Sequence, residues 1–177
     1  VALPNPQTLE SALTQGLVYL FPSTVFEEDY VCCRQFANGN DFRKNPEKYK
    51  NYIKGQIYGY KILITDKQKA VDSLVKASGQ TESYVEKYFY DKEYSGHRTY
   101  KPDPNYNGTL ILYETMEEIG MIENPLPLSS FFDIKVYASA LKEVIKENPS
   151  DDFFKEMWDF FLTHNDKHPD FKAIASL

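Results

Sequence analysis

The sequence predicts a mainly helical protein with a small β component. In most of its longer segments, apolar side chains recur every three or four residues, the spacing of one face of an α-helix. These segments begin at Ser, Thr or Pro and end at Gly or Asn, residues that favour helix starts and stops. Segments rich in β-forming residues are few and short. We therefore expect the core to be built mainly by helices.

The first two helices are expected over residues 8–15 and 46–65. Residues 8–15 carry apolar side chains on one face and end before a glycine. The second helix can begin at Pro46, because the N–H that proline lacks has no intrahelical partner in a first turn. Gly55 and Gly59 lie inside this helix, where each costs on the order of 1 kcal/mol relative to alanine. We therefore expect a neighbouring element to pack closely against these glycines.

Two strands are expected between these helices, over residues 17–21 and 30–36. Both are short, rich in β-forming residues and bounded by turn residues. Cys32 and Cys33 lie in the second strand, where neighbouring side chains point to opposite faces, so one is expected to be buried. A disulfide between adjacent residues is strained, so the pair says little about the redox compartment.

A pair of antiparallel helices is expected next. The first covers residues 67–78 and stops at Gly79, and the second follows Thr81, whose hydroxyl can cap it. Residues 90–106 contain a glycine and two prolines and predict a long loop.

Three further helices complete the expected order. Residues 107–119 have helical spacing and end before Gly120, which can adopt the left-handed conformation of a helix stop. After two prolines, a helix can begin at Ser129 or Ser130 and end at an Asn-Pro pair. Ser150 can then cap a last, aromatic helix.

Composition excludes several classes of function. Hydrophobic residues at 42% and charged residues at 26% are typical of a globular domain. The net charge of −6 argues against binding to nucleic acid, which requires clustered Lys and Arg. No run of apolar residues is long enough to span a bilayer. The chain starts without a secretion signal, so we expect any such signal to have been removed or to lie upstream.

The sequence offers few candidates for chemistry. His164 and His168 lie four residues apart and could ligate zinc, with Asp166 or Asp170 nearby. This pair lacks the general-base Glu of catalytic zinc helices, and Pro169 indicates that the helix is ending, so we expect no metal. His97 stands without a nucleophile signature, and the paired acids are expected to be solvated. Three loop tyrosines are the expected surface contacts: Tyr94, Tyr100 and Tyr106.

Four short motifs, taken in order, carry a resemblance to a known family. They are Asn45-Pro46-Glu47, Lys101-Pro102-Asp103-Pro104, Glu117-Glu118-Ile119-Gly120-Met121-Ile122 and Leu128-Ser129-Ser130-Phe131-Phe132-Asp133. Their order resembles the C-terminal part of bacterial solute-binding proteins, the periplasmic binding proteins of type II that feed transporters of sulfonates, taurine, nitrate and thiamine precursors. The likeness covers residues 8–141. It implies a fragment of an α/β two-lobed fold, with the end of the second lobe and a hinge crossing in residues 1–29 and a compact helical part of the first lobe in 30–177.

The resemblance also implies a function. The chain would be the substrate-binding component of an ABC importer, or a fragment of one. It would capture a small organic anion or a thiamine-precursor-like solute by lobe closure, without chemistry and without a cofactor. Its partner would be the membrane permease, and its location extracytoplasmic. Ligand contacts are expected at Phe21, Ser23 and Thr24.

Two alternatives remain open. Leu17-Val18-Tyr19 stands where the family has Ile-Asp-Ala, and family members are longer than this chain. A stand-alone helical module that binds a protein partner is the first alternative, and it predicts an exposed apolar patch or an obligate dimer. An enzyme similar to thiamine-pyrimidine synthases is the second.

Overall fold

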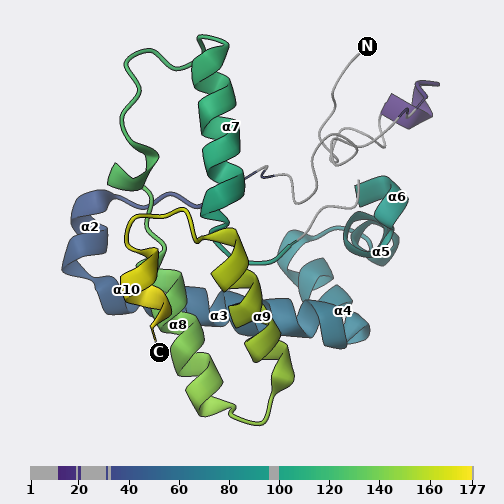
Figure 1. Cartoon of the computed structure of the whole chain (residues 1–177). Helices are drawn as coiled ribbons and strands as arrows, with labels where there is room; N and C mark the ends of the chain where they lie inside the picture. The colour runs from purple at the N-terminus through teal and green to yellow at the C-terminus, as the bar shows by residue number, and fades with distance from the viewer. Residues whose placement is uncertain (1–11, 19, 21–30, 32, 96–99, 177) are drawn as a thin grey trace. The chain divides into compact units, whose positions relative to one another are not determined.

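The computed structural model describes residues 12–18, 20, 31, 33–95 and 100–176 (Figure 1). Residues 12–14 are helical, and Gly16 follows with a φ of 83°. Nine helices follow along the described chain: α2 Gly39–Lys44, α3 Pro46–Thr65, α4 Lys67–Ser78, α5 Glu82–Tyr90, α6 Lys92–Ser95, α7 Tyr106–Glu118, α8 Lys135–Glu147, α9 Asp152–His164 and α10 Phe171–Ala175. A short 3₁₀ helix, η2, covers Leu128–Ser130. The mainly helical class is confirmed.

Local capping signals account for several of the helix ends. The side chain of Thr81 accepts a hydrogen bond from the N–H of Tyr84 at 3.2 Å, which caps α5 as expected. Gly79 and Gly120 adopt φ angles of 69° and 75° after α4 and α7. A left-handed residue lets the backbone N–H groups reach the free carbonyls of the last turn. Gly120 N–H thus bonds to the Glu117 carbonyl at 3.0 Å.

Two expected helix starts are wrong. The helix expected from Ser129 or Ser130 begins at Lys135 instead, because Asp133 accepts the N–H of Val136 at 2.9 Å and so fixes a later start. The cap of α9 is Asp151 and not Ser150, since the Asp151 carboxylate accepts the N–H of Phe153 at 3.2 Å. A carboxylate at a helix start also interacts favourably with the helix dipole.

The expected strands are also wrong over the residues that the structure describes. None of residues 17, 18, 20, 31 and 33–36 lies in a strand. A strand needs a neighbour to satisfy its backbone groups, and the described part of the chain offers none. Arg34 instead uses its side chain, which donates to the Thr109 hydroxyl at 3.3 Å and to the Cys33 carbonyl at 2.7 Å.

The chain divides into two compact units, each described here by itself. Residues 1–30 and 62–100 form the first unit, and residues 31–61 and 101–177 form the second. In the first unit, α4 packs on α5 and buries Val71 and Val85. The Tyr90 hydroxyl donates to the Leu63 carbonyl at 2.9 Å. The boundary that we predict between residues 29 and 30 stays a prediction.

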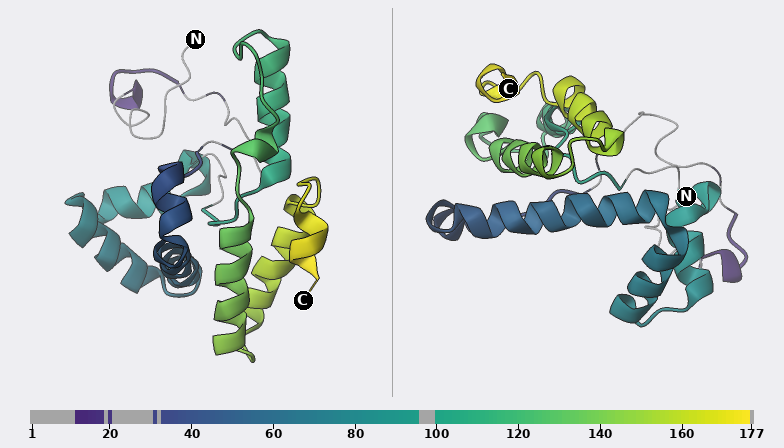
Figure 2. Two further views of the ribbon diagram at one scale, coloured as in Figure 1. Left: turned by 90° about the vertical axis from the view of Figure 1, so that its left-hand side faces the viewer. Right: turned by 90° about the horizontal axis from the view of Figure 1, so that it is seen from below.

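The core of the second unit lies where α3 meets α8 and α9 (Figure 2). Its central side chains are fully buried: Ile57, Ile134, Leu141, Val144, Phe154 and Phe161. Trp158, the single tryptophan, stacks on Phe161 with 5.0 Å between ring centroids. Aromatic pairs of this kind add stability beyond the area that they bury.

Ion pairs join α3 to α8 along the edge of this core. Lys54 bonds to Glu147 at 2.6 Å and to Glu143 at 3.3 Å, and Lys50 pairs with Glu143. Half-exposed pairs of this kind contribute little individually, but they neutralise the acids of α8. Among the described helices, none has both the length and the hydropathy that a bilayer crossing requires.

The close packing that we expected at Gly55 and Gly59 is absent from the described residues. A Cβ built at either position would meet no described atom within 4 Å, and both glycines are exposed. Gly108 is the opposite case. A Cβ there would lie 2.8 Å from Cγ2 of Val31 and 2.9 Å from Nδ2 of Asn105. The glycine that permits a close approach is therefore in α7, not in α3.

This contrast gives a prediction. Gly55→Ala and Gly59→Ala should each raise the free energy of unfolding by about 0.5–1 kcal/mol, because alanine loses less backbone entropy on entering a helix. Gly108→Ala should lower it by about 1–3 kcal/mol, because Val31 or Asn105 must move. Urea unfolding of the three variants measures whether each change raises or lowers the free energy of unfolding. Destabilisation by Gly55→Ala and Gly59→Ala would show that a neighbour does cover this face of α3.

Candidate functional site

A buried polar cluster fixes the base of α7 in the second unit. Four polar residues of this unit are almost completely buried: Asp103, Asn105, Asn165 and His168. They come from the segment that precedes α7 and from the turn that follows α9. Buried polar groups cost free energy unless they are hydrogen-bonded, so their partners decide what the cluster does.

Asn165 lies at the centre of the cluster and is fully buried. Its amide nitrogen donates to Oδ1 of Asp103 and to the Phe161 carbonyl, each at 3.0 Å. Its amide oxygen accepts the backbone N–H of Tyr106 at 2.9 Å. One side chain therefore bonds to the end of α9, to the start of α7 and to Oδ1 of Asp103.

Asp103 is only partly satisfied. Its Oδ1 accepts from Asn165 and from the backbone N–H of Asn105, the latter at 2.7 Å. Its Oδ2 is buried without a hydrogen-bond partner among the described residues. Burial raises the pKa of Asp103 from 3.8 to about 6, because a carboxylate away from water loses its hydration. The two hydrogen bonds oppose this rise.

Asn105 links the cluster to the first turn of α7. It adopts a left-handed conformation with a φ of 44°, which asparagine tolerates better than most residues. Its side-chain oxygen accepts the N–H of Gly108 at 3.0 Å and so caps the helix. Asn107 adds a second link, since its amide donates to Asp166 at 2.6 Å and to the Thr163 carbonyl at 3.3 Å.

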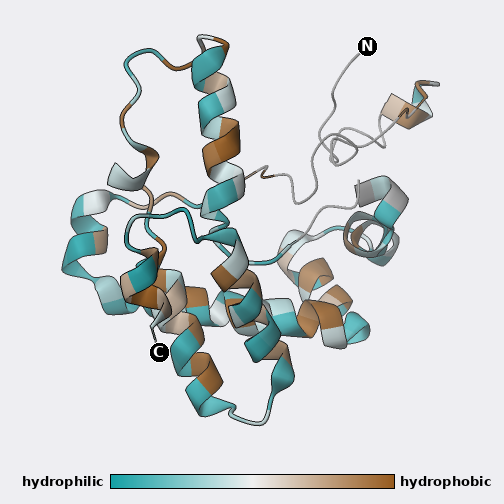
Figure 3. Cartoon of the chain, viewed as in Figure 1, coloured by the Kyte–Doolittle hydropathy of each residue, from teal (hydrophilic) through white to brown (hydrophobic). Residues whose placement is uncertain are grey.

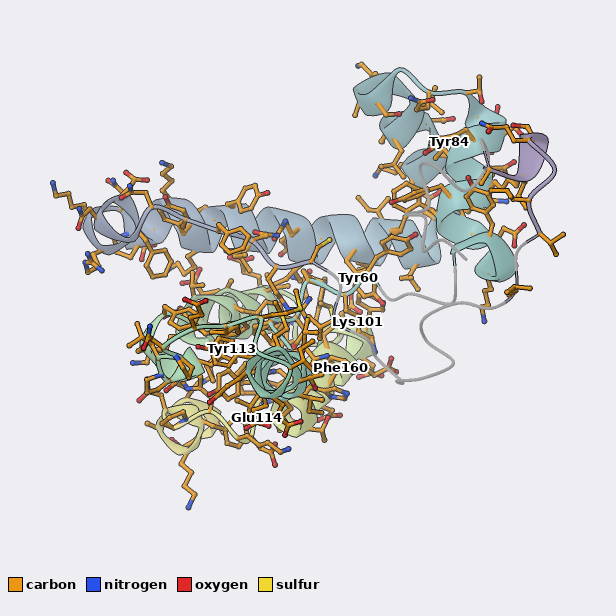
Figure 4. All side chains as sticks on the ribbon, turned by 90° about the horizontal axis from the view of Figure 1, so that it is seen from above. Tyr60, Tyr84, Lys101, Tyr113, Glu114 and Phe160 are labelled. Atoms are coloured by element: carbon orange, nitrogen blue, oxygen red, sulfur yellow. The ribbon has the colours of Figure 1, made fainter. Side chains whose placement is uncertain are left out.

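The two histidines of the candidate zinc pair do different things. His164 ends α9 and stacks on Phe160, with 3.6 Å between ring centroids. The ammonium of Lys101 lies 3.7 Å from the centroid of the Phe160 ring (Figure 4). His168 lies beyond the helix and packs edge-on against Tyr106 at 4.7 Å. In the described part of the chain, no group of three or more His, Cys, Asp or Glu could hold a metal ion.

The hydrogen bonds of His168 are made to backbone groups, so this histidine has a structural role. Its Nδ1 accepts the N–H of Asp170 at 3.1 Å, so its Nε2 carries the proton and donates to the Phe132 carbonyl at 3.2 Å. The cluster as a whole pairs side chains with backbone groups at element ends. It can orient α7, and among its described members it brings no nucleophile next to a base.

A projecting arm begins at this base. We define the arm as α7 and residues 119–131, which return toward the core (Figure 1). The hydroxyl of Tyr113 donates to the Leu126 carbonyl at 2.8 Å, and its ring lies 6.0 Å from that of Phe131. These two contacts hold the return segment against α7.

The arm exposes more large apolar side chains than the rest of its unit. The second unit has seven that are exposed among its described residues, and two of them, Phe36 and Tyr52, lie outside the arm. The other five lie in the arm: Ile111, Ile119, Met121, Leu126 and Phe131. Exposed fractions reach 66% at Ile119 and Met121 and 60% at Phe131. Figure 3 shows apolar residues, in brown, on α7 and on the segment that follows it.

The ligand contacts that the resemblance implies stay a prediction. Phe21, Ser23, Thr24, Cys32 and His97 lie outside the described residues. Cys33 is exposed.

Two of the loop tyrosines expected at the surface are buried, so this expectation is wrong for them. Tyr94 and Tyr106 are 6% and 4% exposed. Tyr100 is half-buried, and its ring lies 4.9 Å from that of Phe89 in the first unit. Burial of aromatic rings on a neighbouring helix outweighs the polar character of the loop sequence.

The first unit has a shallow surface depression among its described residues. It is lined by Lys67, Ser83, Glu86, Lys87, Tyr90 and Asp91. Lys67 and Glu86 pair with each other across it at 2.6 Å. Two of its charged groups therefore neutralise each other, and the arm is the stronger candidate.

Comparisons with known proteins identify no relative from which a function could be transferred. No protein-family model matches the chain, and no curated protein or solved structure is significantly similar to it.

Proposed function

We propose that this chain is a protein-interaction module that docks a partner protein through its arm. The observation that carries the proposal is the set of five exposed apolar side chains on the arm. Monomeric domains expose single apolar residues routinely, but a large apolar patch is typical of an interaction surface. Fully burying a side chain of the size of Ile, Leu, Met or Phe contributes about 1.5–3 kcal/mol.

The buried polar cluster at the start of α7 also supports this proposal, because it fixes the base of the arm. Asn165 and Asn105 accept N–H groups of the first turn of α7, and Asn107, within that turn, donates to the Thr163 carbonyl of α9. A surface that is oriented before binding loses less entropy when a partner docks. The cluster therefore supplies the rigid base that a docking arm needs.

Site-specific photo-crosslinking in the source cells tests the proposal. A benzoylphenylalanine residue replaces Met121 or Leu126 in the full protein, and in a control it replaces Tyr52. Tyr52 is 59% exposed and lies in the same unit but outside the arm. We expect a discrete crosslinked product from both arm positions and none from position 52.

A second set of variants checks that the product depends on the apolar surface. Ile119→Ser combined with Leu126→Ser should abolish the product from position 121. Both side chains are mostly exposed, so the fold should be retained, which the melting temperature verifies. Equal products from positions 121 and 52, or none from either, would overturn the docking role.

Solute capture for an importer is the second proposal. It is supported by the helix that begins at Pro46 and by the stop at Gly120, which stand in the order that the solute-binding family has. Under this proposal the chain belongs to an α/β two-lobed fold and meets a membrane permease. A ligand that binds only the folded state raises its melting temperature. Saturating taurine, nitrate or a thiamine pyrimidine should then raise it, whereas the interaction module should show no change.

A further inference from the structure

We propose that the partner segment is basic as well as apolar, with Lys or Arg residues flanking its apolar side chains. This inference rests on the proposed docking function of the arm. It goes further by stating the chemistry of the partner segment that docks on the arm. The argument comes from the charges of the arm, which differ from those of the rest of the second unit.

The arm contains four acidic residues and no Lys, Arg or His: Glu114, Glu117, Glu118 and Glu123. All four are exposed. None of them forms a salt bridge with any residue that the structure describes. On α8, by contrast, Glu143 and Glu147 both pair with lysines of α3. The arm therefore holds charges that are uncompensated within the described chain.

Two of these acids share a face of α7 with one of the exposed apolar side chains. Ile111, Glu114 and Glu118 are spaced three and four residues apart, so they share one face of α7. All three are exposed. Figure 4 views α7 nearly along its axis and labels Tyr113, which holds the return segment, and Glu114 on different sides of the helix. A partner that buries Ile111 must also meet these carboxylates.

The position of the acids opposes the stability of α7. Glu117 and Glu118 lie in its last turn, where the helix dipole disfavours negative charge. Glu114 lies three and four residues before them, and like charges at these spacings repel. The helices α2, α4, α5 and α8 each carry a basic residue in the last turn. Local rules are broken most often at functional sites, and a basic partner would offset this charge.

The same charges argue against a second copy of the chain. In a symmetric dimer formed through the arm, each patch would face its own copy. Eight carboxylates, four from each of two arms, would then meet without a cation from either arm. Juxtaposed like charges disfavour association, whereas a basic segment would complement the arm.

Peptide binding to the full protein tests this inference. The probe is a fluorescein-labelled peptide that repeats Leu and Lys at helical spacing, followed by fluorescence anisotropy at low salt. Its counterpart carries Glu in place of every Lys. We expect the Leu/Lys peptide to bind and the Leu/Glu peptide to bind at least about tenfold more weakly.

Two quadruple variants separate the arm from general acidity. The arm variant is Glu114→Gln, Glu117→Gln, Glu118→Gln and Glu123→Gln. The control removes four exposed acids outside the arm by Asp72→Asn, Glu82→Gln, Glu156→Gln and Asp159→Asn. The arm variant should bind the Leu/Lys peptide about tenfold more weakly, and the control should remain within about twofold of the original chain. The melting temperature of the arm variant should equal or exceed that of the original chain.

The outcomes also separate this inference from the docking proposal. Equal losses of affinity for the Leu/Lys peptide in the two quadruple variants would overturn the basic partner. Any acidic surface of the protein would then be sufficient to bind the peptide. Failure of the peptide to bind, with position-specific crosslinking from Met121 retained, would overturn the basic partner and leave the docking role. Failure of both experiments would overturn both. A crosslinked product of twice the mass of the chain would assign the arm to self-association.

Discussion

Replacing Asn165 by leucine is expected to lower the free energy of unfolding of the second unit by about 3–5 kcal/mol. Leucine has nearly the same shape, so the substitution removes hydrogen bonds without opening a cavity. The buried N–H of Tyr106 and the Phe161 carbonyl each lose a partner. An unsatisfied buried polar group costs about 1–3 kcal/mol, and a buried charge costs more. Asp103 loses one of its two hydrogen bonds as well.

Trp158 makes the measurement specific to this unit. It is the single tryptophan and packs beside Phe161, so its fluorescence during urea unfolding reports on the second unit. Asn107→Ala is the matched control, because Asn107 also joins the turn after α9 but its bonds are exposed. The control should lower the free energy of unfolding by at most about 1 kcal/mol. Similar losses in the two variants would mean that the buried cluster does not determine stability.

Most helices could be predicted from the sequence because their signals are local. The bounds of α3 and α4 follow from Pro46, Gly79 and apolar spacing, and those of α5 follow from the Thr81 cap. Each of these signals acts within one turn of the residue that carries it. The start of α8 could not be predicted because Ser129, Ser130 and Asp133 all offer side-chain oxygens to backbone N–H groups, and local sequence does not rank them.

Strands and glycine packing could not be predicted in the same way. Residues 33–36 have β-forming neighbours, but a strand forms only if another strand pairs with it. Gly55 and Gly59 give the same sequence signal whether a neighbour is close or absent. In both cases the deciding information lies in a distant part of the chain.

The buried cluster could not be predicted from the sequence. Asp103 lies in a Lys-Pro-Asp-Pro motif that resembles a known family, and Asn165 lies between the two histidines of a candidate zinc pair. Their hydrogen bond spans 62 residues of sequence, so no local pattern points to it. The exposure of the arm was equally hidden, because Ile119 and Met121 look like ordinary apolar residues at a helix end.

The second large expected effect is a pH-dependent stability that depends on Asp103. The pKa of this carboxyl is raised by burial to about 6 in the folded protein, against 3.8 ordinarily. Between pH 4 and 6, the folded state thus holds a proton that the unfolded state has released. Stability must therefore fall as pH rises through this window. Above about pH 6 the loss is complete, and it is on the order of 3 kcal/mol at 1.36 kcal/mol per unit of pKa.

Asp103→Asn isolates this contribution, because asparagine keeps the acceptor for Asn165 and cannot ionise. Near pH 4, where Asp103 is already neutral in the folded protein, the variant and the original chain should be about equally stable. At pH 8 the variant should be more stable by about 2–3 kcal/mol. Other carboxyls, including Asp41, whose pKa its hydrogen bonds with Lys48, Tyr49 and Asn45 lower to about 2, titrate identically in both proteins and cancel. Urea unfolding at pH 4 and pH 8 measures the difference in the free energy of unfolding between the variant and the original chain. If this difference does not change with pH, Asp103 titrates in the folded state as it does in water.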